Sequence, residues 1–157
     1  MKSGQKRKNR DRPGVPVAIT EEQKFFFPEG LLGFSACHDF VVGPFRPDDG
    51  SCSPFLILRE GQGSFSLPLI HPQFVMPEYE IEPSPEILAH LGAHSAGDLA
   101  VMVIATLKET PEDITVNLAG PLLLNPARSL GAQIVVEHYP VRYPLLRKAS
   151  LATSPSC

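Results

Sequence analysis

Short apolar runs separated by turn residues make up most of this chain. In several of them polar and apolar positions alternate, as at 64–70, where three apolar side chains alternate with two serines and a proline. A period of two indicates β-strands with one buried face. The run at 99–107 is almost wholly apolar and predicts a central strand. The predicted strands lie at or within residues 15–27, 40–45, 54–59, 64–70, 99–107 and 131–138.

One helix is predicted. Ser84 is a typical cap, Pro85 suits the first turn, and apolar residues at helical spacing continue to His90–Gly92. Residues 72–83 are expected to be extended or irregular. Pro140 and Pro144 are expected to break the chain after the last strand, and the stretch from Leu145 is either a short helix or a frayed end.

The segment Thr115–Asn125 predicts two short strands with a hinge at Gly120–Pro121. Proline has no N–H for a strand ladder, so this break indicates a bulge, a bend or a sheet edge. The Asn117 amide must find hydrogen-bond partners or face solvent. It either ties down the bend or contacts a partner, and the spacing alone leaves both open.

Many short strands and a single helix predict a mostly β fold. We expect one compact domain with a strongly bent antiparallel sheet, or a β-barrel-like sheet, because closure removes edges that apolar strands cannot safely expose. The chain of 157 residues has room for a single core. The expected divisions are a disordered basic arm at 1–14, a β domain at 15–148 and a flexible tail at 149–157.

The charge is unevenly distributed. The first twelve residues hold six of the 14 Lys and Arg side chains and one of the 17 Asp and Glu side chains, a local balance of +5. The remainder therefore holds eight basic and 16 acidic side chains, a balance of −8. An acidic body suits a basic protein partner and disfavours nucleic acid. The basic arm is either a solvated tail or a loose RNA contact.

Three cysteines without a CxxC pair argue against a disulfide framework and a zinc site. No apolar run is as long as a membrane span, and no apolar stretch follows the basic start as in a signal peptide. We therefore expect the bacterial cytosol.

Candidate chemistry is sparse. No phosphate loop, GxSxG elbow or HExxH motif is present. His90 and His94 with Asp98 form an incomplete metal set, and solvated surface histidines are the expected alternative. A small enzyme would have to use His71 or His138 with Glu78. An RNA-associated protein would have to use the arm.

Glu78, Glu80 and Glu82 alternate with Tyr79 and Ile81. In an extended chain the three carboxylates lie on one side and the two apolar side chains on the other. The stripe is either a solvated strand face over an apolar one or a binding surface for a basic partner.

Four segments in this order and spacing resemble FliW, the bacterial flagellar assembly factor. They are Phe27–Phe34, His71–Tyr79, Thr115–Asn125 and Gly131–Val136, and the resemblance runs from about residue 25 to about residue 146. It implies a compact β-barrel-like domain with little helix, no catalysis and no cofactor. It implies binding to the translational repressor CsrA, a small basic dimer, which ends the repression of the flagellin messenger by CsrA. It also implies binding to newly made flagellin, which competes with CsrA for the assembly factor.

The chain departs from the family pattern at four positions. Leu32 replaces a usual Pro, His71 a usual Asp, Gly120 a usual Ala, and Arg59 a common Gln. Two of these changes make the surface less acidic, which bears on partner affinity. The residues predicted to bind a partner are Glu78, Tyr79, Glu80, Asn117, Pro121 and Asn125, although Asn117 and Pro121 build the bend in either case.

Overall fold

The computed structural model describes residues 18–51 and 53–146, so the predicted arm at 1–14 and tail at 149–157 lie outside the described residues. In this part of the chain, strands dominate and one short α-helix, α2 (Pro85–His90), is present. Three 3₁₀ turns are η1 (Pro72–Phe74), η2 (Ala96–Asp98) and η3 (Pro111–Asp113). The strands are β1 (Gln23–Phe26), β2 (Asp39–Pro44), β3 (Leu56–Glu60), β4 (Ser66–Ile70), β5 (Ala100–Thr106), β6 (Thr115–Val116), β7 (Leu122–Asn125), β8 (Leu130–Gln133) and β9 (Tyr143–Pro144).

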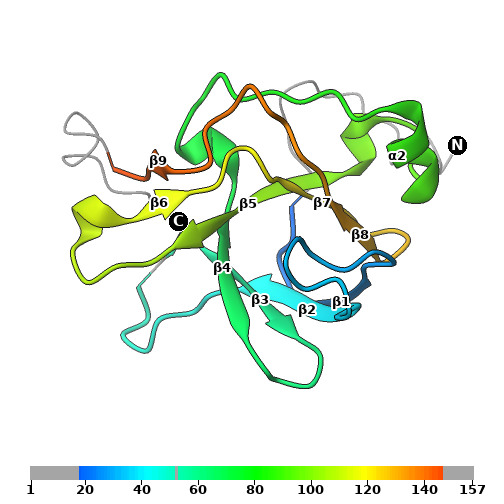
Figure 1. Cartoon of the computed structure of the whole chain (residues 1–157). Helices are drawn as coiled ribbons and strands as arrows, with labels where there is room; N and C mark the ends of the chain where they lie inside the picture. The colour runs from blue at the N-terminus through cyan, green and yellow to red at the C-terminus, as the bar shows by residue number, and fades with distance from the viewer. Residues whose placement is uncertain (1–17, 52, 147–157) are drawn as a thin grey trace, which may run out of the picture.

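Seven of these strands form a closed ring in the order β4-β3-β2-β1-β8-β7-β5, and pairing of β4 with β5 closes it (Figure 1). β6 pairs with the end of β5, and β9 pairs with β6, outside the ring. The predicted β-barrel-like domain with one short helix is confirmed. One pair departs from the antiparallel expectation: β1 and β8 are parallel, through Phe26 and Leu130.

The ring is filled by alternate side chains of its strands. Phe25, Phe40, Leu58, Met102 and Leu122 are each at most 2% exposed and belong to one apolar cluster. On β8 the inward position is Gly131, where an added Cβ would stand 2.5 Å from the Phe27 ring. The glycine leaves the room that this ring occupies.

Outward-facing apolar residues are covered by the segments between the strands. Leu123 of β7 packs with Leu91 and Leu99, beside α2. Ile70 and Val103 pack with Tyr79, from the segment that joins η1 to α2. Both faces of β5 and β7 are therefore buried, which explains why their sequences are continuous apolar runs.

The predicted strands at 40–45, 54–59, 64–70 and 99–107 correspond to β2, β3, β4 and β5. Ser84 caps α2 as predicted, and its side chain accepts a hydrogen bond from the Ile87 N–H. Of the strand predicted at 15–27, the described part is strand only in β1. The prediction of a break at Pro144 is wrong, because Pro144 pairs with Thr115 in β9. At the sheet edge a missing N–H leaves no neighbour unpaired.

The strand predicted at 131–138 ends at Gln133. Beyond it the chain keeps the same register, since the N–H groups of Ile134 and Val136 donate to the carbonyls of Pro121 and Ala119. Pro121 has no N–H to return, and the Ala119 N–H donates to Asn117 instead. Residues 134–136 are therefore extended, and they donate backbone hydrogen bonds to residues 119–121 without accepting any in return.

Candidate partner-binding site

The acidic stripe lies on the segment between η1 and α2, which crosses the outside of the barrel (Figure 1). Tyr79 is 3% exposed, and its hydroxyl donates to the Leu118 carbonyl at 2.7 Å. Its ring centroid lies 4.3 Å from that of Tyr139. The Tyr139 hydroxyl in turn accepts from the Glu80 N–H and donates to the Glu80 carbonyl, both at 3.0 Å. Two tyrosines therefore hold the stripe against the barrel.

This anchoring produces the predicted alternation. Glu78, Glu80 and Glu82 are exposed, Tyr79 is buried and Ile81 is half-buried. Burial raises the pKa of Tyr79, with a smaller contribution from Tyr139, so its hydroxyl stays a neutral donor. In the part of the chain that is described, none of the three carboxylates takes part in an ion pair.

The hinge at Gly120–Pro121 is present where it is predicted. The Asn117 Oδ1 accepts from the Ala119 N–H at 3.0 Å, a local turn that ties down the bend. The Gly120 carbonyl accepts from Gln133 Nε2 at 2.8 Å. An added Cβ on Gly120 would stand 2.9 Å from Asn117 Nδ2 and 3.0 Å from Gln133 Nε2. The Gly in place of the usual Ala therefore suits two close amides.

Asn125 is an internal tie. It is 2% exposed, its Nδ2 donates to the Leu91 carbonyl at 2.7 Å, and its Oδ1 accepts from the Ala127 N–H at 3.1 Å. It thus joins the end of α2 to the turn after β7. Because this amide is buried and bonded at both ends inside the fold, it is not presented to a partner.

The six predicted binding residues therefore divide into two groups. Glu78 and Glu80 face solvent, whereas Tyr79, Pro121 and Asn125 are buried and Asn117 is half-buried. The bond from Tyr79 to Leu118 brings the stripe and the hinge together, while Asn125 lies with the end of α2. Contact with a partner stays a prediction, and in this structure the exposed glutamates are the members able to make it without rearrangement.

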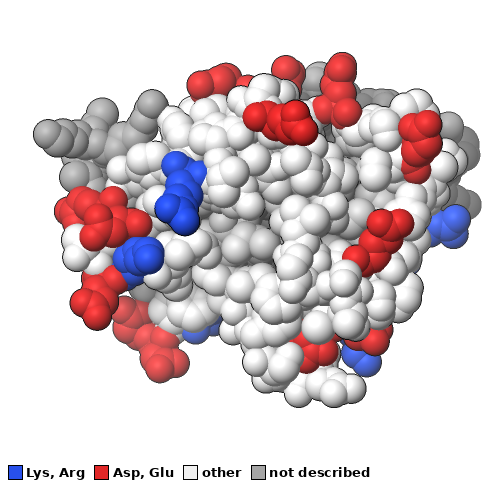
Figure 2. Space-filling model, in the orientation of Figure 1, with Lys and Arg blue, Asp and Glu red and all other residues white. Residues whose placement is uncertain are grey.

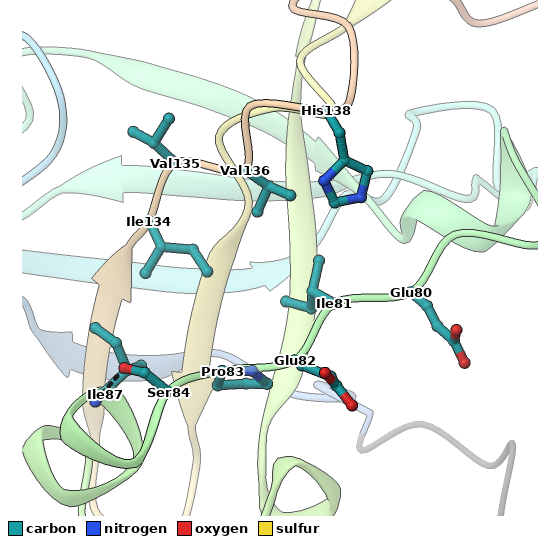
Figure 3. Close-up of a pocket in the computed structure, with 10 residues that line it drawn as sticks. All are labelled: Glu80, Ile81, Glu82, Pro83, Ser84, Ile87, Ile134, Val135, Val136 and His138. Carbon is teal, nitrogen blue, oxygen red and sulfur yellow. Dashed lines mark hydrogen bonds between the residues drawn. The ribbon is translucent and has the colours of Figure 1, made fainter.

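A groove of about 780 Å³ runs between residues 80–84 and the extended residues 134–138 (Figure 3). Ile134 and Val136 face the opposite wall, where Ile81 and Pro83 stand, and Val135 points away. Ile87 of α2 lines one end, and His138 and Glu80 line the other. The Glu80 and Glu82 carboxylates stand on the outer side of their wall. The groove thus joins an apolar interior to an acidic rim.

Sequence analysis missed the 134–138 wall. Its apolar residues have the pattern of a continuing buried strand. Their spacing does not indicate that reciprocal backbone hydrogen bonding ends at Gln133. Tyr139, whose hydroxyl spans the two walls, was also not predicted. The available signal was Pro121, since a missing N–H must leave its partner strand incompletely paired.

The histidines show no catalytic arrangement among the residues that the structure describes. His71 is half-buried, and its Nδ1 has no hydrogen-bond partner. Burial lowers the pKa of His71, and a hydrogen bond with the Val101 backbone partly opposes the shift. Glu78, its predicted partner in the enzyme alternative, is exposed.

In the metal set considered from the sequence, His90, His94 and Asp98, the Asp98 carboxylate is engaged in backbone hydrogen bonds. The Asp98 Oδ2 accepts from the His94 N–H at 2.8 Å and takes part in the capping box of η2. Across residues 18–51 and 53–146, no three His, Cys, Asp or Glu side chains converge to hold a metal ion. None of the helices in this range is long and apolar enough to span a membrane.

Two more departures from the family pattern have structural counterparts. The Leu32 N–H donates to Gln133 Oε1 at 2.8 Å, a bond that the usual Pro could not make. Arg59 forms an ion pair with Glu22 on the barrel surface. These residues fit the fold as it stands, so the departures leave the architecture intact.

Comparison with known proteins agrees with this geometry. The family model described as "FliW protein" matches residues 10–145. The chain is 33% identical over 140 residues to the flagellar assembly factor FliW of Desulfitobacterium hafniense strain Y51, covering 87% of this chain and 90% of that one. It is 32% identical over 133 residues to the FliW of Natranaerobius thermophilus, covering 82% and 85%.

The fold comparison gives the same result. A crystal structure of the flagellar assembly factor FliW superposes with a TM-score of 0.71 and 27% identity, over 80% of this chain and 86% of that chain. The resemblance of the four sequence segments, the closed barrel and these matches agree, and the chain belongs to the FliW family of flagellar assembly factors.

Proposed function

We propose that this protein works in the bacterial cytosol by binding other proteins, not by catalysis. It binds the translational regulator CsrA as an antagonist, so that flagellin translation proceeds, and it binds flagellin, so that translation follows flagellum assembly. Family membership supports the flagellar role. The CsrA and flagellin partnerships come from the resemblance.

The observation that carries the proposal is the acidic stripe on a fixed scaffold. Glu78, Glu80 and Glu82 project from a segment that Tyr79 locks to the barrel. Acidic side chains gather along the upper edge of the face in Figure 2, where the segment between η1 and α2 runs in Figure 1, and no Lys or Arg appears among them. A basic dimer such as CsrA is attracted to such a surface.

Calorimetric titration with the CsrA of the same organism, at two salt concentrations, tests the proposal. We expect a saturable complex that weakens as salt screens the charges, and we expect flagellin to displace CsrA. A chain lacking residues 1–12 serves as control and keeps its binding. Failure to bind either protein would refute the proposal, and binding to CsrA that disappears with residues 1–12 would favour the arm instead of the stripe.

A further inference from the structure

The groove between residues 80–84 and 134–138 combines an apolar interior with an acidic rim. Its interior is formed by branched aliphatic side chains and a proline, contributed by Ile81, Pro83, Ile87, Ile134 and Val136. Its rim carries Glu80 and Glu82, with no Lys or Arg among the lining residues. An apolar centre with a charged rim is the composition of a protein-binding surface.

The walls of the groove are extended chain with free backbone groups. The backbone N–H and C=O groups of Ile81 and Glu82 make no hydrogen bond within residues 18–51 and 53–146. On the other wall, the backbone of Val135 makes no hydrogen bond in the same part of the chain. A helix satisfies its own backbone and gains nothing from such groups, whereas an extended peptide pairs with them.

The groove is also held open by the fold. The Tyr139 hydroxyl bridges both walls at one end through the Glu80 N–H and carbonyl. At the other end Ser84 caps α2, which fixes the start of the helix beside Ile87. Because the walls are fixed, a ligand does not have to order them on binding.

We propose that this groove is the docking site for an extended segment of a basic protein partner, in which branched aliphatic side chains alternate with Lys or Arg. The aliphatic side chains enter between Ile81 and Val136, and the basic ones meet the Glu80 and Glu82 carboxylates. This inference rests on the proposed function, since CsrA is the basic partner there. Charge complementarity and the unpaired backbone select the occupant.

The chain's own arm is a weaker match for the groove. Residues 1–12 carry six basic side chains, but apart from Met1 they contain no apolar one to fill the interior. The arm could therefore pair with the acidic rim but could not fill the apolar interior.

Fluorescence anisotropy with labelled CsrA tests the inference in the full chain. The groove variant is Glu80→Lys with Glu82→Lys. Its matched control is Glu109→Lys with Glu112→Lys, the same charge change at exposed positions in and before η3. We expect the groove variant to lose about tenfold or more in affinity at about 0.15 M salt and the control to stay within about twofold, because at that salt the Debye length is only about 8 Å and charges far from the contact are screened.

A second variant, Val136→Ser, tests the interior. It keeps the backbone bond to Ala119 and removes apolar contact, so we expect about tenfold weaker binding that raising the salt does not change. Thermal melts of all variants separate lost contact from lost folding. Wild-type chain that fails to bind CsrA would overturn the proposed function and this inference with it.

Wild-type binding with groove variants that bind equally well would overturn this inference alone. So would an effect of the groove variants that vanishes once residues 1–12 are deleted, because the arm would then be the occupant. A concentration-dependent dimer that only the groove variants dissociate would make a second copy the occupant and would overturn it as well.

Discussion

Asn125 offers the sharpest separation of a structural residue from a binding one. Sequence reasoning placed it among partner contacts, and the structure buries it between α2 and the turn after β7. Asn125→Ala removes both of its side-chain hydrogen bonds. The Leu91 carbonyl lies in a residue that is fully buried, so water does not replace the lost donor there. The Ala127 N–H belongs to an exposed residue, where water does replace the acceptor.

The cost follows from this difference. A buried carbonyl left without a partner costs about 1–3 kcal/mol, and the bond to Ala127, replaced by water, adds about 0.5–1 kcal/mol. We therefore expect Asn125→Ala to lower the free energy of unfolding by about 3 kcal/mol. Asn117→Ala removes one bond from a half-buried side chain and should cost about 1 kcal/mol. Gln62→Ala, on an exposed turn, should stay within about 0.5 kcal/mol.

Urea unfolding followed by far-ultraviolet circular dichroism measures these differences, since the chain has no Trp to report by fluorescence. With a slope of about 2 kcal/mol per molar urea, the Asn125→Ala midpoint should fall by about 1.5 M at an unchanged slope. A midpoint within 0.3 M of wild type, on the order of the shift expected for Gln62→Ala, would refute the reasoning. Normal stability with lost CsrA binding would make Asn125 a contact residue after all.

Three further predictions concern the scaffold. Tyr79→Phe keeps the ring but leaves the Leu118 carbonyl without its donor, so unfolding measurements should show a loss of about 1–2 kcal/mol; no loss would mean that water reaches that carbonyl. Gly131→Ala places a methyl against the Phe27 ring, and a melt should report about 1–3 kcal/mol of destabilisation; a neutral result would show that the ring moves aside freely. Because burial lowers the pKa of His71 from 6.5, protonation favours the unfolded chain, so stability should be full above pH 6.5 and decline below it. His71→Gln should flatten that decline between pH 7.5 and 5.5, and an unchanged decline would assign it to other groups.

The local elements follow from the sequence because their causes are local. Alternation at 64–70 and the apolar run at 99–107 specify strands, and the Ser84 side chain caps α2 through an N–H three residues away. The hinge at Gly120–Pro121 is equally local, since proline removes a donor wherever it stands. A strongly bent or β-barrel-like sheet is also predicted from the sequence, because it hides apolar strand edges.

Relations between distant segments depended on the tertiary structure. Asn125 and Leu91, or Tyr79 and Leu118, are separated by more than thirty residues, and no local pattern tells which carbonyl a buried amide or hydroxyl will meet. The parallel contact of β1 with β8 likewise arises from closing the ring.

Strands β2 to β5, the helix, the hinge, the acidic stripe and the family are predictable from the sequence, because periodicity, capping, charge and motif order are properties of neighbouring residues. Contacts between distant segments make Glu80 a rim residue and Asn125 an internal tie, and they make residues 134–136 the second wall of a groove. Burial and hydrogen-bond pairing depend on which segments come into contact in the folded chain, and no short stretch of sequence specifies those long-range contacts.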